Sequence, residues 1–502
     1  TFRKAKKFFD VVTYTGDGTA RTIAHNLGST PGMIIVKRLN GAKNWAVYHA
    51  SLGANYWDIL NLAQAAQVNT NLWNNTAPTD SVFSVGTDGH NNGNNDTYVA
   101  YLFASDAGGF GADGTENIIK CGSFTTDSSG NASVTLGFEP QWVLDKTSSY
   151  NAAWSIVDMM RGFDTLQSNG YNQAPILSPN TSNAESLTGG EARINATGFT
   201  VTGTTASQTF IYIAIRRPMK TPESGTEVYK GVTRTGSASD FSVDSFGFTG
   251  DFLLSSIRTP AGYGSYAFSR LMGGQYLRPY GANAEADGAS SLSSWDMDGF
   301  SGLSNGGLTN DNGVTYVYNL FKRATGFMDV VAYTGNATIR TIAHNLGVVP
   351  ELMLFKNRPT NNIYWIVYNS TDGAEKYLIL NEDNSVADSI DHFNDTEPTS
   401  SVFTVGDAAY TNRNTDGMIA YLFATLAGVS KVGTYTGTGA DLNVDCGFTA
   451  SARYILIKRT DSAGDWYTYD SARGISAGND PYLLLNTTAA EVTNTDYIDP
   501  LN

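Results

Sequence analysis

Two histidines are the first residues in this sequence that could act as a metal ligand or a general base. His25 and His344 lie in two identical segments, RTIAHNLG at 21–28 and at 340–347. Neither has a Cys, Asp or Glu at the spacing of a zinc site, and Val134 stands at the matching place of the second copy of the repeat, at 118–217. We therefore predict that both histidines are structural and form hydrogen bonds at the end of a strand.

Three short motifs resemble functional signatures. GISAG at 474–478 matches the nucleophile elbow, but no helical pattern follows Ser476, and the elbow requires a strand, a sharp turn and a helix. GFGADG at 109–114 matches a dinucleotide fingerprint but does not lie between a strand and a helix. DMDG at 296–299 contains only part of a calcium-binding loop. We predict no catalytic, cofactor-binding or metal-binding residue.

Aromatic and acidic side chains could instead bind or cleave a sugar. Four tryptophans share one place in the repeats described below: Trp45, Trp154, Trp365 and Trp466. Aromatic residues that recur in register are typical of a core rather than of a ligand platform. The 47 acidic residues are numerous enough that counting does not exclude a glycosidase pair. The polar loops at 86–96 and 281–299 are the candidate contact loops, and the binding residues themselves remain unknown.

Long internal repeats must position all of these residues. Beyond the shared RTIAHNLG, FFDVVTYTG at 8–16 matches FMDVVAYTG at 327–335, and AYLFA occurs at both 100–104 and 420–424. Three weaker copies share the same order of strand-like runs: an opening run, an apolar run, an aromatic run, a run that ends in Asn or polar residues, and a closing run. A period of this kind indicates an array of one repeated unit.

The repeat boundaries follow from these runs. We predict a remnant of a preceding repeat at 1–7, four repeats and an incomplete fifth. The five repeats, numbered in chain order, are 8–104, 118–217, 228–323, 327–424 and 431–502. Each has about seven or eight strand-like runs separated by Gly, Asn, Asp, Ser and Pro, which is typical of an antiparallel sandwich. The fold class is therefore all-β, a tandem array of about five antiparallel β-sandwich domains that resemble jelly rolls.

The ends and joins of the repeats carry further expectations. TFRKA at 1–5 aligns with LFKRA at 320–324, and the fifth repeat has no closing run, so we expect a longer array cut at both ends. The segment 105–117 is long and glycine-rich, whereas the join at 322–327 is short. We expect the short join to restrict rotation and to make the C-terminal part stiffer.

Composition limits the classes of function. The sequence has 32 basic and 47 acidic residues, a net charge of −15, which disfavours nucleic acid as a partner. No apolar run approaches the ~18 residues of a membrane span, so no membrane insertion is expected. Cys121 and Cys446 stand at different places of the repeat, so we predict free, buried thiols.

The chain resembles a repeat domain of uncharacterised function that is common in structural proteins of marine tailed bacteriophages, especially cyanophage-like ones. The first and fourth repeats carry the resemblance best. It implies a non-enzymatic virion structural protein without cofactors, located in the virion on a tail fibre or other appendage, extracellular, and involved in host attachment. The implied partners are other virion proteins, a host-surface glycan or protein receptor, and further copies of the chain, with a trimer expected.

Two other classes remain open. A bacterial extracellular adhesin or filament subunit would have a very similar sequence, and a secretion or wall-anchoring signal would distinguish it. A surface-polysaccharide depolymerase would require an acidic pair in a groove of one repeat and absent from the others.

Overall fold

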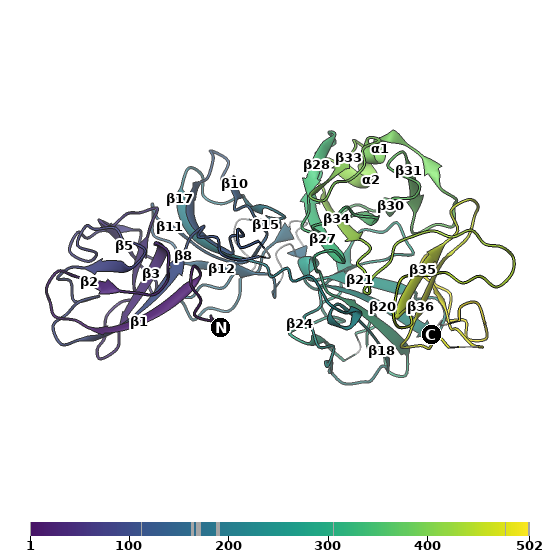
Figure 1. The fold of residues 1–502 in the computed structure, drawn as a ribbon, viewed down its shortest axis with the longest axis horizontal. Coiled ribbons are helices and arrows are strands. Elements are labelled where there is room, and N and C mark those ends of the chain that lie inside the picture. The colour runs from purple at the N-terminus through teal and green to yellow at the C-terminus, as the bar shows by residue number, and fades with distance from the viewer. Residues whose placement is uncertain are drawn as a thin grey trace. The chain divides into compact units, whose positions relative to one another are not determined.

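The protein is described from a computed structural model that covers residues 2–111, 113–161, 165–166, 172–186, 191–304, 306–476 and 478–499. The chain divides into two compact units (Figure 1). Unit 1 comprises Thr1–Met159 and Asn172–Pro218, and unit 2 comprises Met160–Tyr171 and Met219–Asn502. The structure is almost entirely antiparallel β, which confirms the all-β prediction. No helix of the described residues is long and apolar enough to cross a membrane.

Repeat 1 has a six-stranded sheet and a facing pair of strands. The sheet, in spatial order, is β1 (Phe9–Thr15), β8 (Thr97–Ala104), β3 (Pro31–Arg38), β4 (Ala46–His49), β5 (Tyr56–Ile59) and β6 (Gln67–Val68), and the pair is β2 (Arg21–Ala24) with β7 (Val82–Val85). The closing strand β8 lies between the opening strand β1 and β3. The core forms between the two layers, where Ile23 and Phe83 of the pair pack with Ile34 and Leu102 of the sheet.

Repeat 2 repeats this plan, with four strands in its main sheet among the described residues. The main sheet is β12 (Ser155–Asp158), β11 (Pro140–Thr147), β17 (Thr209–Arg216) and β9 (Ile119–Thr125), and the second is β10 (Ala132–Thr135), β16 (Gly198–Thr202) and β15 (Glu191–Asn195). Two more short strands are β13 (Thr165–Leu166) and β14 (Asn172–Gln173). The closing strand β17 again lies beside the opening strand β9.

Repeats 3 and 4 return to the six-stranded sheet. Repeat 3 contains β18 (Tyr229–Thr235), β26 (Thr315–Phe321), β20 (Phe252–Thr259), β21 (Ser265–Ser269), β22 (Gln275–Leu277) and β23 (Ala286–Asp287), faced by β19 (Phe241–Val243), β25 (Gly299–Gly302) and β24 (Ser294–Asp296), with 3-10 turns η1 (Gly225–Glu227) and η2 (Arg270–Met272). Repeat 4 contains β27 (Met328–Thr334), β34 (Gly417–Phe423), β29 (Leu352–Asn357), β30 (Ile366–Asn369), β31 (Lys376–Ile379) and β32 (Ala387–Asp388), faced by β28 (Arg340–Ala343) and β33 (Val402–Val405), with short helices α1 (Ile390–Phe393) and α2 (Ala409–Asn412).

Repeat 5 is reduced to a single three-stranded sheet among the described residues. Its strands are β35 (Tyr454–Lys458), β36 (Trp466–Asp470) and β37 (Leu483–Leu484). The opening segment 431–449 contains no strand and lies mostly exposed. In the complete repeats the opening strand pairs with the closing strand, as β27 does with β34. An opening sequence without that partner leaves its backbone groups to water.

Candidate functional site

The two histidines make the same pair of contacts in repeats 1 and 4. His25 Nε2 lies 3.3 Å from the Thr79 carbonyl oxygen, and its Nδ1 accepts the Leu27 N–H at 3.2 Å. His344 contacts the Thr399 carbonyl at 3.1 Å and accepts the backbone N–H two residues later at 3.2 Å. Burial lowers the pKa of both rings. Each ring therefore ties a strand end to a neighbouring loop, with both nitrogens engaged.

The described residues of two signature-like motifs, at 474–478 and 296–299, make local contacts. The Ser476 hydroxyl donates to the Asn479 carbonyl at 3.3 Å in a loop, and Ala477 lies outside the described residues. Asp296 ends β24, and Asp298 accepts backbone N–H groups, including that of Ser245 at 3.0 Å. Both cysteines are free, and burial raises the pKa of the Cys121 thiol. These contacts hold loops together.

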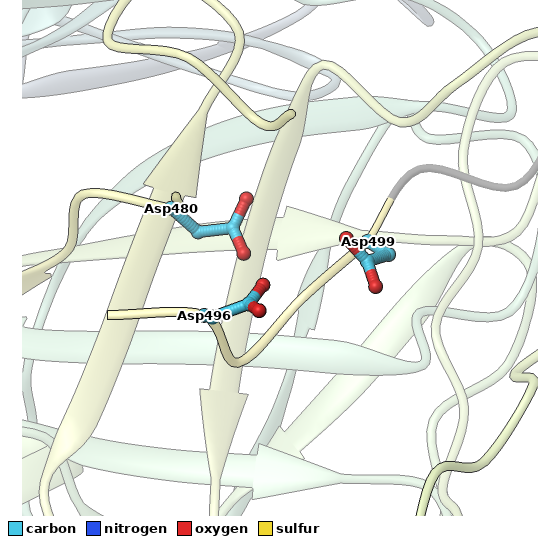
Figure 2. Close-up of side chains that lie close together, drawn as sticks. All are labelled: Asp480, Asp496 and Asp499. Atoms are coloured by element: carbon cyan, nitrogen blue, oxygen red, sulfur yellow. The ribbon is translucent and has the colours of Figure 1, made fainter. Parts of the chain in front are cut away.

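Three aspartates of repeat 5 form the one group of possible metal ligands found among the described residues. One oxygen from each of Asp480, Asp496 and Asp499 lies within 4.8 Å of the others (Figure 2). Asp480 is buried, and its two oxygens accept the backbone N–H groups of Ser476 at 3.1 Å and Ile498 at 3.0 Å. The other two carboxylates are exposed. Asp480 thus anchors the C-terminal loop, and the cluster alone does not define a cation site.

The candidate contact loops contain both exposed and buried residues, and several of their polar side chains bind partners inside the protein. In the loop 86–96, Asn92 is fully buried and its amide donates to the carbonyls of Gly86 at 2.7 Å and Thr19 at 2.6 Å. Asn412 makes the same two bonds in repeat 4, both at 2.7 Å. In the loop 281–299, Glu285 is buried against the next repeat. Polarity suggested solvent contact, but these polar groups satisfy buried backbone and side-chain partners.

The four equivalent tryptophans reveal a construction that joins neighbouring repeats. Each backbone N–H donates to an Asn side chain of its own repeat; the pairs are Trp45–Asn61 at 2.8 Å, Trp154–Asn180 at 3.0 Å, Trp365–Asn381 at 2.9 Å and Trp466–Asn486 at 3.0 Å. Three of the indoles donate to a carbonyl of the preceding repeat. The acceptors are Ile59 for Trp154 at 3.0 Å, Arg278 for Trp365 at 2.9 Å and Ile379 for Trp466 at 3.1 Å.

A backbone bond accompanies each of these indole contacts. A backbone N–H of one repeat donates to the backbone carbonyl just beyond the apolar strand of the next repeat. The donors lie five residues after Asn61, Tyr280 and Asn381, which share one place in the repeats. The bonds are Ala66 to Ser148 at 3.2 Å, Glu285 to Arg358 at 2.7 Å and Val386 to Thr460 at 2.9 Å. We call this combination of indole and backbone bonds the joint. It recurs from repeat 1 to 2, from 3 to 4 and from 4 to 5. Directional bonds at equivalent places fix how each repeat follows the last.

In unit 2 the joints close into a ring of three repeats. The Glu491 N–H of repeat 5 donates to the Arg258 carbonyl of repeat 3 at 2.9 Å, and the two side chains form a bidentate ion pair at 2.9–3.0 Å. Repeat 3 has Ser265 where the others have Trp, so this joint uses the ion pair without an indole. The contacts 3→4, 4→5 and 5→3 are head-to-tail and close after three steps.

Aromatic side chains fill the middle of the ring. Phe321, at the end of the closing strand of repeat 3, lies 6.3 Å from Phe423 of repeat 4 and 5.4 Å from Tyr454 of repeat 5, measured between ring centroids. Tyr421 of repeat 4 lies 4.7 Å from Phe252 of repeat 3. The two pairs of Phe321 are edge-to-face, and aromatic contacts of this kind add to the stability gained by burial.

Buried charged groups cluster at the joints. Arg358 and Glu285 form an ion pair at 2.7 Å with neither side chain exposed. Burial lowers the pKa of Lys356 to about 7. At the joint of unit 1, burial raises the pKa of Asp58 to about 6, partly offset by the positive charge of Lys146 from the next repeat. Perturbed titratable groups can mark active sites, but here they are buried where one repeat packs on another.

Neighbouring repeats pack directly on each other across both the long linker at 105–117 and the short join at 322–327. Repeats 1 and 2 share one hydrophobic cluster, in which Val36 and Trp57 of the first pack with Trp154 and Ile213 of the second. The same kind of joint forms across the short join between repeats 3 and 4. The bonds of the joint, rather than the length of the linker, set the packing.

Comparison with protein families divides the chain near the boundary between unit 1 and unit 2. Residues 4–217 and 224–502 match the model of a domain of unknown function, DUF7483. Because the two matches cover nearly the whole sequence, the chain belongs to the DUF7483 family. The second match spans the three repeats of the ring in unit 2, and the first spans repeats 1 and 2. No curated protein sequence matches the chain.

Proposed function

We propose that the protein is a non-enzymatic structural component of a virion appendage, of tail-fibre type, that contributes to attachment at a host surface. The observation that supports this best is the joint. One set of contacts recurs between successive repeats, and the polar groups that looked functional serve the joints or the turns. A structural array needs such repetition, whereas catalysis needs one set of residues that differs from the rest.

The proposed partners follow from composition and repetition. An acidic chain is suited to protein or glycan partners rather than to nucleic acid. Equivalent repeats present equivalent surfaces, so weak contacts with other virion proteins or with a host receptor gain strength through effective concentration. The resemblance to repeats of marine tailed bacteriophages adds the virion location and an expectation of homo-oligomers. The chain would thus be an appendage module built from interlocked sandwiches.

Immunogold electron microscopy tests this proposal on the particle from which the protein is isolated. Antibodies raised against the chain should label appendages of a tailed virion, and antibody pre-absorbed with the purified chain serves as the control. Label along a free filament or on a cell surface, without a capsid, would replace the proposal with a bacterial adhesin or filament subunit. Release of reducing sugar from host envelope polysaccharide by the purified chain would contradict the non-enzymatic assignment.

A further inference from the structure

Residues 2–10 of unit 1 reproduce the contacts of residues 321–329 of unit 2. Ala5 bridges Phe9 as Ala324 bridges Met328. The ion pair of Lys4 with Asp10 at 2.7 Å matches that of Arg323 with Asp329, also at 2.7 Å. In unit 2 these residues connect the closing strand of repeat 3 to repeat 4. The start of unit 1 is therefore shaped as a connection from a closing strand.

Phe2 occupies the place that Phe321 has in the ring. Its ring centroid lies 5.5 Å from Phe103 and 6.1 Å from Trp142, as that of Phe321 lies 6.3 Å from Phe423 and 5.4 Å from Tyr454. Phe321 is 6% exposed, whereas Phe2 is 42% exposed. The same aromatic contacts form in both units, but only in unit 2 does a whole sandwich cover the aromatic residue.

Repeat 4 packs on repeat 3 through a face that includes Arg358 and Trp365, and the equivalent face of repeat 1 is more exposed. Leu39 is 58% exposed, and Arg358, at the same place in repeat 4, is fully buried. Trp45 stacks on Tyr101 at 6.4 Å as Trp365 stacks on Tyr421 at 6.2 Å. Trp365 and Tyr421 are buried, while both residues of the repeat 1 pair are partly exposed. Within the described residues, the Trp45 indole N–H has no acceptor.

We propose that the face of repeat 1 formed by Leu39, Trp45 and Tyr101 is the docking site of one further β-sandwich of the repeat 3 type, whose closing strand ends beside Phe2. Its carbonyl at the place of Arg278 accepts the Trp45 indole N–H, and its phenylalanine at the place of Phe252 covers Tyr101. Unit 1 with this sandwich is a ring of three, as unit 2 is. The occupant is a β-sandwich of the repeat 3 type.

Extending the chain tests the docking site directly. A second copy of residues 228–320 is joined to Phe2, which reproduces the Leu–Phe step at 320–321. Hydrogen–deuterium exchange of the segment 39–45 should slow at least ten-fold and approach that of 358–365. Leu39→Arg should slow it further in the extended chain only, because the incoming repeat brings the equivalent of Glu285. Unchanged exchange at 39–45 would overturn the proposal.

Two measurements on the unextended chain keep the test decisive even if the added copy does not fold. Trp45→Ser should lower the thermal midpoint of unit 1 by clearly less than Trp365→Ser lowers that of unit 2, because the Trp45 indole N–H has no acceptor among the described residues and its ring is only partly buried. An equal loss for Trp45→Ser would mean that its indole is already engaged and would overturn the open docking site. Protection of 39–45 that rises with protein concentration would assign the face to a second copy of the chain instead.

Discussion

Repeats 4 and 5 carry similar opening sequences but differ in structure. In repeat 4, VVAYTG at 330–335 lies in β27, and the Tyr333 hydroxyl donates to the Thr411 carbonyl. In repeat 5, the related VGTYTG at 432–437 forms no strand, and Tyr435 is 51% exposed. Repeat 4 has the closing strand β34 beside its opening strand, and the described part of repeat 5 has no equivalent. Strand propensity alone does not make a strand without a partner that takes up its backbone bonds.

The largest effect is expected from a charge placed in the closing strand of repeat 4. Leu422 is fully buried in the core, so Leu422→Asp should cost more than ~4 kcal/mol of unfolding free energy. The matched control is Leu442→Asp in the exposed opening segment of repeat 5, with a change within about 0.5 kcal/mol. Denaturant unfolding measures both, and similar losses would contradict the contrast between the two repeats.

The next largest effect is expected at the buried ion pair between repeats 3 and 4. Arg358→Met leaves the buried Glu285 carboxylate in the joint without its ion-pair partner. The free energy of unfolding should fall by about 3–5 kcal/mol. Arg459, near the same place in repeat 5, pairs with Asp461 on the surface, so Arg459→Met should show no measurable loss. Combining Arg358→Met with Glu285→Leu should recover most of the stability, and a larger loss in the double variant would refute this account.

A pH dependence distinguishes the lysines of the two repeats. The folded pKa of Lys356 is lowered by burial to about 7, below its unfolded value, so its burial penalty is complete below pH 7 and disappears as pH rises toward 10. Between pH 7 and 9, the free energy of unfolding of the native chain should rise by on the order of 2–3 kcal/mol relative to that of Lys356→Met. The pKa of Lys458 is lowered as well, but this side chain is partly exposed, so Lys458→Met should show a smaller dependence. Thermal unfolding across this range measures both, and equal slopes would contradict the difference in burial.

The smallest effect should be shared by the two repeats. Trp365→Phe and Trp466→Phe each remove an indole N–H and leave a carbonyl of the preceding repeat without its donor, at about 1–2 kcal/mol each. Repeat 5 keeps the joint although its described residues form only a three-stranded sheet, so the losses should be similar. A much smaller loss for Trp466→Phe would show that the joint depends on the intact sandwich.

The sequence predicted the all-β fold well because alternation and turn residues are local signals. It predicted the packing between repeats poorly. Trp45 and Trp365 stand in the same local pattern, yet only Trp365 is covered by a neighbour. Likewise Leu39 and Arg358 occupy one place, and nothing near Arg358 in the sequence indicates that Glu285, 73 positions earlier, is its partner. The tryptophan that recurs at one place in four repeats, followed 16 residues later by Asn in repeats 1 and 4, was a sequence signal for the joint.

Closing three repeats within a single polypeptide changes how unit 2 responds to dilution. A trimer of separate chains dissociates as its concentration falls. A repeat that leaves this ring stays covalently connected to its neighbours through linkers of a few residues. Its effective concentration is on the order of millimolar for short linkers, whatever the concentration outside. Each joint can therefore be weak by itself and still re-form after opening, so the ring can persist at concentrations at which an assembly of separate subunits would dissociate.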